Sequence, residues 1–174
     1  MAQRLLLLAL TLGVLGAACG RADDEQQLRV AFESMRTALL DRDYSTVWDF
    51  MDSGSREALA KQLRDLQGVE PGTAQHAAAA ASLKELGLSV EQVKDLDAGE
   101  YFVAILEGLD RVQPELRERQ LEGTRARTIT ELTVDGDRAE MTTMSPSGAA
   151  ETFTWVREGS GWKCKATSVG EGIR

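Results

Sequence analysis

Residues 128–144 read TITELTVDGDRAEMTTM, and they determine the fold class. The first half is rich in β-branched side chains, which favour extended backbone. Asp135-Gly136 is a strong signal for a two-residue hairpin turn, and residues 139–144 continue as a strand on its far side. The sequence therefore predicts an antiparallel hairpin here.

Two further strands are predicted after this hairpin. Pro146-Ser147-Gly148 marks the next turn, and residues 151–157 follow as a third strand. Gly159-Ser160-Gly161 then precedes a fourth strand over residues 162–168. Consecutive strands joined by such short loops form an antiparallel meander.

The chain before the meander has helical periodicity. Leu28, Phe32, Met35 and Leu39 recur at helical spacing and predict a first helix over residues 25–40. Further helices are expected after Asp43, from Ser55 to Gly68, over residues 77–86, after Ser89, after Asp97 and from Pro114 to about Gly123, with a loop over residues 69–76. Helices followed by a sheet indicate an α+β fold, in which N-terminal helices pack on one face of a curved four-stranded antiparallel sheet, with a helical insertion before it.

The N-terminal residues have the pattern of a bacterial lipoprotein signal. Arg4 precedes a Leu-rich run, and Gly16-Ala17-Ala18 leads directly to Cys19. We expect a signal peptide over residues 1–18 and a lipid anchor on Cys19. The alternative is an ordinary secretory peptide cut near Ala18, which would leave the protein periplasmic or secreted.

This interpretation divides the chain into four parts. Residues 1–18 form the signal peptide, residues 19–25 the acylated Cys and a tether, residues 26–169 a single α+β domain, and residues 170–174 a C-terminal tail. Because Gly20 and not Asp follows Cys19, we expect the outer membrane, with the domain facing the periplasm.

Composition argues against several classes of function. A formal net charge of −8 opposes binding to nucleic acid, which depends on clustered Lys and Arg. One His and two Cys make a structural zinc site implausible, so neither a metal nor a cofactor is expected. Cys164 shares a predicted strand face with Trp162 and Ala166, which indicates a buried, inert thiol.

Four aromatic residues are candidates for lining a cavity inside the fold: Trp48, Tyr101, Trp155 and Trp162. The alternative is that they fill the core, as large aromatic residues usually do. Tyr44 and Tyr101 are expected to pack with their hydroxyl groups in water. Glu131 alternates with Ile129 and Thr133, opposite Leu132 and Val134, so we expect it on the solvent side of its strand.

Several of these segments resemble a known superfamily. Leu40-Asp41-Arg42-Asp43-Tyr44 after the first helix, the Trp48 helix, Val134-Asp135-Gly136-Asp137-Arg138-Ala139 and Gly159-Ser160-Gly161-Trp162-Lys163 look like small bacterial lipoproteins with a nuclear-transport-factor-2-like domain. The resemblance covers residues 25–67 and 124–169 and implies a cone-shaped α+β fold. The superfamily includes isomerase-like and dehydratase-like enzymes as well as non-enzymes, so it does not determine function.

The expected function is therefore that of a non-catalytic cell-envelope lipoprotein, whose domain binds a partner protein or a small apolar ligand. The alternative is a periplasmic enzyme of the same fold. It would use a carboxylate or Tyr in a pocket, with Glu131, Tyr101 and His76 as candidates.

Overall fold

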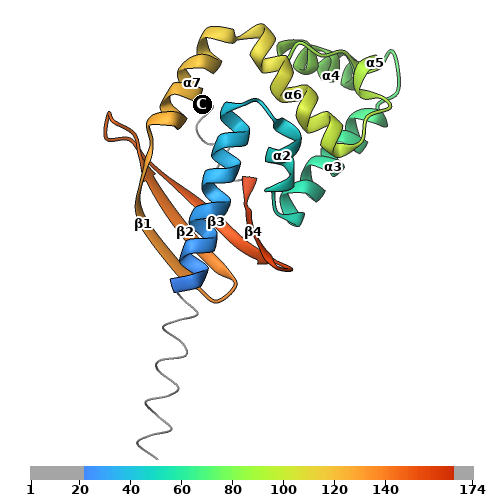
Figure 1. Ribbon diagram of the computed structural model, residues 1–174. Helices are drawn as coiled ribbons and strands as arrows, with labels where there is room; N and C mark the ends of the chain where they lie inside the picture. Colours follow the sequence, from blue (N-terminus) through green and yellow to red (C-terminus); the bar gives the residue numbers. More distant parts are fainter. Residues whose placement is uncertain (1–21, 167–174) are drawn as a thin grey trace, which may run out of the picture.

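A computed structural model describes residues 22–166 of the chain. It has the predicted α+β organisation, with helices preceding an antiparallel sheet of strand order β1-β2-β3-β4 (Figure 1). The described part of the first helix covers residues 22–40. The other elements are α2 (Tyr44–Asp49), α3 (Ser53–Gln67), α4 (Ala74–Glu85), α5 (Val90–Val93), α6 (Ala98–Val112), α7 (Pro114–Ala126), β1 (Thr128–Asp135), β2 (Arg138–Met144), β3 (Ala150–Glu158) and β4 (Gly161–Cys164).

The first helix crosses one face of the sheet and buries its apolar stripe there (Figure 1). Leu28 on the helix and Met141 and Trp155 on the sheet are each 0% exposed. The Phe32 ring lies 6.5 Å from the Trp155 ring in an edge-on arrangement and 5.7 Å from the Phe153 ring. The predicted helical stripe therefore forms the core with the inner face of the sheet.

The helix also includes residues 22–24, which the sequence analysis placed in the tether. The Asp24 carboxylate forms an ion pair with Arg157 on β3, and this contact fastens the start of the described helix to the sheet. Cys19 and the signal peptide lie outside the described residues. Within residues 22–166, no helix has the length and apolar character needed to cross a bilayer.

A β-bulge in β1 changes the predicted face of Ile129. The pairing with β2 shifts between Ile129 and Glu131, so Thr130 takes up one extra position. Ile129 consequently packs against the core together with Leu132, and the alternation that placed Ile129 beside Glu131 is wrong. Glu131 is exposed, as predicted.

The fourth strand is shorter than predicted, and another segment of the chain pairs with its end. β4 ends at Cys164, whose N–H donates to the Phe50 carbonyl at 2.7 Å. The Asp52 N–H donates to the Cys164 carbonyl at 3.0 Å. This backbone pairing joins the end of β4 to the segment that precedes α3. The predicted tail, residues 170–174, lies outside the described part.

Most helix boundaries follow their capping residues. The capping boxes Ser89 with Gln92 and Asp97 with Glu100 are both present, as predicted. Asp52 caps α3, which therefore begins at Ser53, two residues before the predicted start. Thr73 accepts a hydrogen bond from the His76 N–H, so α4 begins inside the predicted loop. α7 also runs three residues beyond Gly123, to Ala126.

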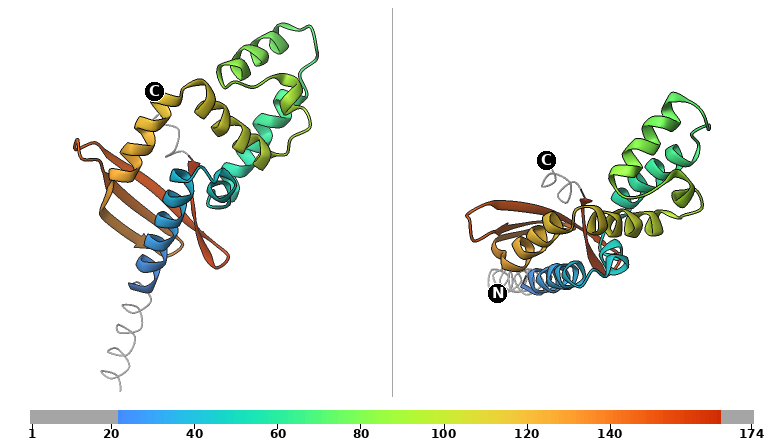
Figure 2. Two further views of the ribbon diagram at one scale, coloured as in Figure 1. Left: turned by 45° about the horizontal axis from the view of Figure 1, so that its top comes forward. Right: turned by 90° about the horizontal axis from the view of Figure 1, so that it is seen from above.

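Helices α3–α6 form a lobe of their own, which we call the helical lobe (residues 53–112). It extends away from the sheet (Figures 1 and 2). Its core is separate from that of the sheet and consists of Leu63, Leu83, Leu88, Val93 and Tyr101. The predicted helical insertion is therefore a packed unit beside the sheet.

The lobe depends on a close backbone contact at Gly108 of α6. A Cβ atom placed on Gly108 would lie 1.9 Å from the carbonyl oxygen of Leu86, at the end of α4. Gly87, which follows Leu86 in the chain, has φ of +67°, a conformation that favours glycine. The end of α4 can rest on α6 only because residue 108 has no side chain.

Gly108→Ala should therefore lower the free energy of unfolding by about 2 kcal/mol or more, since the carbonyl of Leu86 must move. Urea denaturation followed by circular dichroism measures the change. Gly123→Ala on α7 is the matched control, because no atom lies within 4 Å of its added Cβ. It should be neutral or stabilising by up to about 1 kcal/mol. Equal effects of the two substitutions would contradict the contact.

Candidate functional site

Two of the four candidate aromatic residues lie in the sheet core. Trp155 is 0% exposed and Trp162 is 3% exposed, and both belong to the cluster that the first helix covers. The Arg157 guanidinium lies 4.5 Å from the centre of the Trp162 ring, in a cation–π contact. Their rings fill the inner face of the sheet.

The other two candidates lie elsewhere. Tyr101 is 1% exposed in the core of the helical lobe, where burial raises the pKa of its phenol. Trp48 on α2 is half-buried and packs against Phe102 on α6, with ring centres 5.5 Å apart. The structure thus distributes the four aromatic residues over three places.

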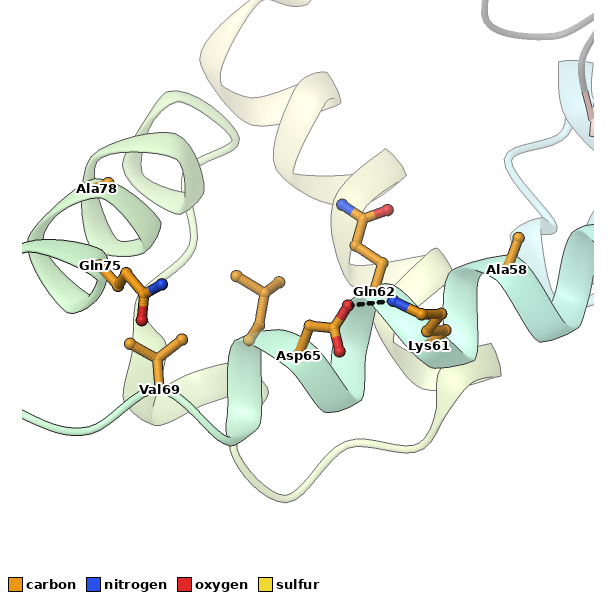
Figure 3. Close-up of a pocket in the computed structure, with 8 residues that line it drawn as sticks. Ala58, Lys61, Gln62, Asp65, Val69, Gln75 and Ala78 are labelled. Atoms are coloured by element: carbon orange, nitrogen blue, oxygen red, sulfur yellow. Dashed lines mark hydrogen bonds and ion pairs between the residues drawn. The ribbon is translucent and has the colours of Figure 1, made fainter.

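The first surface groove lies between α3 and α4, and we call it the α3–α4 groove. It has a volume of about 500 Å³, is open to solvent, and is lined by Ala58, Lys61, Gln62, Asp65, Leu66, Val69, Gln75 and Ala78. Figure 3 shows Gln75 and Ala78 on the α4 side, and an ion pair of 2.7 Å between Lys61 and Asp65 on α3. The groove thus combines apolar, amide and charged groups. Such a lining is complementary to the surface of a protein, and less so to a small apolar molecule.

A second groove of about 600 Å³ follows the outer side of the first helix and the start of α2. Most of its lining residues are polar, and they include Glu33, Asp41 and Asp43. Val30, which is 55% exposed, is its largest exposed apolar side chain. None of the four candidate aromatic residues lines either groove.

A polar cluster joins α2, α6 and α7. The Tyr44 hydroxyl donates to the Asp110 carboxylate at 2.5 Å, and Arg117 Nε donates to the other Asp110 oxygen at 3.1 Å. Burial, followed by the hydrogen bond to Asp110, raises the pKa of Tyr44. The expectation of a solvated Tyr44 hydroxyl is therefore wrong. Residues 44 and 110 are distant in sequence, and no local pattern announces their contact.

The remaining catalytic candidates do not converge. Glu131 is exposed on β1, Tyr101 is buried in the helical lobe, and His76 lies near the start of α4. Among residues 22–166, no group of three or more His, Cys, Asp or Glu side chains is placed to hold a metal ion. No arrangement for acid–base chemistry stands out in this part of the chain.

Cys164 is a free, buried thiol. Burial, with a smaller contribution from Asp52, raises its pKa from 9.0 to about 12. The predicted burial of this thiol is therefore confirmed. Burial and a raised pKa both support the prediction that it is inert, because a nucleophilic cysteine requires a lowered pKa and access to solvent.

No protein-family model, curated protein or solved structure matches the chain. The likeness to nuclear-transport-factor-2-like lipoproteins therefore remains a prediction from the sequence.

The raised pKa of Cys164 makes stability depend on alkaline pH. Above pH 9.0 the unfolded thiol loses its proton while the folded thiol keeps it, so the unfolded state binds fewer protons and stability falls. The loss due to Cys164 should be on the order of 1 kcal/mol between pH 8 and pH 10. Urea denaturation at a series of pH values measures this slope.

Cys164→Ala provides the control. The variant should retain only the pH dependence of other groups, including Tyr44 and Tyr101, and its slope between pH 8 and pH 10 should be shallower. Identical slopes in the two proteins would contradict the assignment. Thiol reagents should also modify Cys164 only after unfolding.

Proposed function

We propose that this protein is a non-catalytic lipoprotein of the bacterial cell envelope, whose domain binds a partner protein. The proposed anchor is an acyl group on Cys19, and the proposed location is the outer membrane, with the domain facing the periplasm. The leader pattern that ends at Gly16-Ala17-Ala18-Cys19 supports both statements.

The observation that carries the non-catalytic proposal is the filled inner face of the sheet. In a cone-shaped enzyme this face would surround the substrate, whereas here Phe32, Phe153 and Trp155 occupy it. Side-chain packing of this kind supports a stabilising role for these residues.

The surface of the helical lobe supports a protein partner over a small apolar ligand. The α3–α4 groove is open, and Lys61, Asp65 and two glutamine side chains accompany its apolar lining. Such a mixture resembles the composition of protein interfaces, whose apolar contacts are accompanied by hydrogen bonds. The formal charge of −8 favours a partner that presents a basic surface.

Photo-crosslinking in the native cell tests this proposal. A benzoylphenylalanine at Gln75, which lines the groove, should give one adduct of defined mass. The same residue at Thr152, which is exposed on the outer face of the sheet, should not give this adduct. The positional contrast separates a specific partner from random collisions.

A matched pair of α4 substitutions completes the test. Ala78 lines the groove, and Ala78→Arg should abolish the adduct by filling it. Ala77 is exposed on the same helix and does not line the groove, so Ala77→Arg should leave the adduct intact. An adduct that forms equally at Gln75 and Thr152, or that survives Ala78→Arg, would overturn the proposed binding surface.

A further inference from the structure

We propose that the end of the sheet near Arg157 faces the membrane, and that the α3–α4 groove is presented away from the bilayer. This inference rests on the anchor at Cys19 in the proposed function. It assigns a lipid surface to one end of the domain and the partner surface to the other.

The proposed anchor and the domain are separated by only a short length of chain. Three peptide units separate Cys19 from residue 22, where the described helix is already present. Consecutive Cα atoms lie 3.8 Å apart, so the span is at most about 11 Å. An acyl chain on Cys19 would therefore hold residue 22 close to the lipid headgroups.

Ion pairs and hydrogen bonds of Arg157 fix this helix to the sheet. The Arg157 guanidinium pairs with Asp24 at 2.5 Å and with Asp137, in the β1–β2 turn, at 3.6 Å. The Arg157 N–H also donates to the Asp137 carbonyl at 2.8 Å. Arg157 and Asp24 are both largely shielded from solvent, with side-chain exposures of 22% and 30%, which limits screening by salt. We call this region the anchor end: residues 22–25, 135–138 and 157–161.

The anchor end is acidic and presents none of the most exposed large apolar side chains. Its charged residues are Asp23, Asp24, Glu25, Asp135, Asp137 and Glu158, against Arg138 and Arg157. Such an excess of carboxylates is repelled by anionic headgroups. The large apolar side chains that are most exposed among the described residues, Val30, Val112, Leu116 and Met144, all lie outside it. The anchor end would thus rest at the surface without inserting.

Helix α3 leads from the anchor end toward the α3–α4 groove. The Ser53 N–H at the start of α3 donates to the Glu158 carboxylate at 2.9 Å, so α3 begins beside the anchor end. The helix has 15 residues and is therefore about 22 Å long. It leads to α4 and α5 of the helical lobe, which lie at the far end of the molecule from the start of the first helix (Figures 1 and 2). Most of the groove lining belongs to the second half of α3 and to α4.

Energy transfer to labelled lipids tests this orientation in the full-length, acylated protein. A cysteine is introduced at Ser160 of the anchor end or at Gln75 of the groove, both of which are exposed. Each variant is labelled with a donor fluorophore, and the buried Cys164 stays unlabelled. The proteins are reconstituted in phosphatidylcholine–phosphatidylglycerol vesicles that carry a headgroup acceptor. Transfer from Ser160 should be at least about twofold more efficient, given the length of α3.

The outcomes separate the two proposals. Equal or reversed efficiencies in a vesicle-bound protein would overturn the orientation and leave the anchor standing. Protein that remains in the supernatant without transfer from either position would overturn the anchor, and the orientation with it. Asp24→Asn should reduce the difference between the positions by removing the ion pair to Arg157. Asp23→Asn, which alters a neighbouring carboxylate, should preserve the difference.

Discussion

The packing of Phe32 against Trp155 is the contact on which the rest of this structure depends. It joins the first helix to the third strand and brings together segments from the two ends of the domain. Because it places the helix across the sheet, the inner face is filled with side chains. The same placement brings Asp24 to Arg157 and so determines at which end of the sheet the described helix begins.

The separate core of the helical lobe also follows from this packing. The first helix already covers the inner face of the sheet, so α3–α6 bury their apolar residues against one another. They do so around Tyr101 and Leu83, in a core separate from that of the sheet. The contact of Trp48 with Phe102, together with the Tyr44–Asp110–Arg117 cluster, connects the two units. We propose a division of roles in which the interiors provide stability, the helical lobe carries the recognition surface, and an acyl group on Cys19 provides attachment.

The sequence predicted the features that depend on neighbouring residues. The hairpin between β1 and β2, the two capping boxes and the stripe of the first helix are all present, because each signal acts within a few positions. The two turn residues are Gly136 and Asp137, one position later than predicted. The sequence did not predict the features that depend on contacts between distant residues. The bulge at Thr130, the pairing of residues 50–52 with β4 and the Tyr44–Asp110 bond depend on tertiary contacts that no local pattern encodes. The groove was missed for the same reason, since it exists only where α3 and α4 come together, and residues 74–76 of α4 had been predicted as loop.

Side chains fill the space between the first helix and the inner face of the sheet, and hydrogen exchange of the tryptophan indole groups tests this packing most directly. The indole N–H groups of Trp155 and Trp162 are buried without a hydrogen-bond partner, whereas Trp48 is half-buried. Nuclear magnetic resonance should show that the first two exchange orders of magnitude more slowly than Trp48, at rates limited by global unfolding. Exchange of Trp155 and Trp162 as fast as that of Trp48 would contradict the claim and indicate an open cavity.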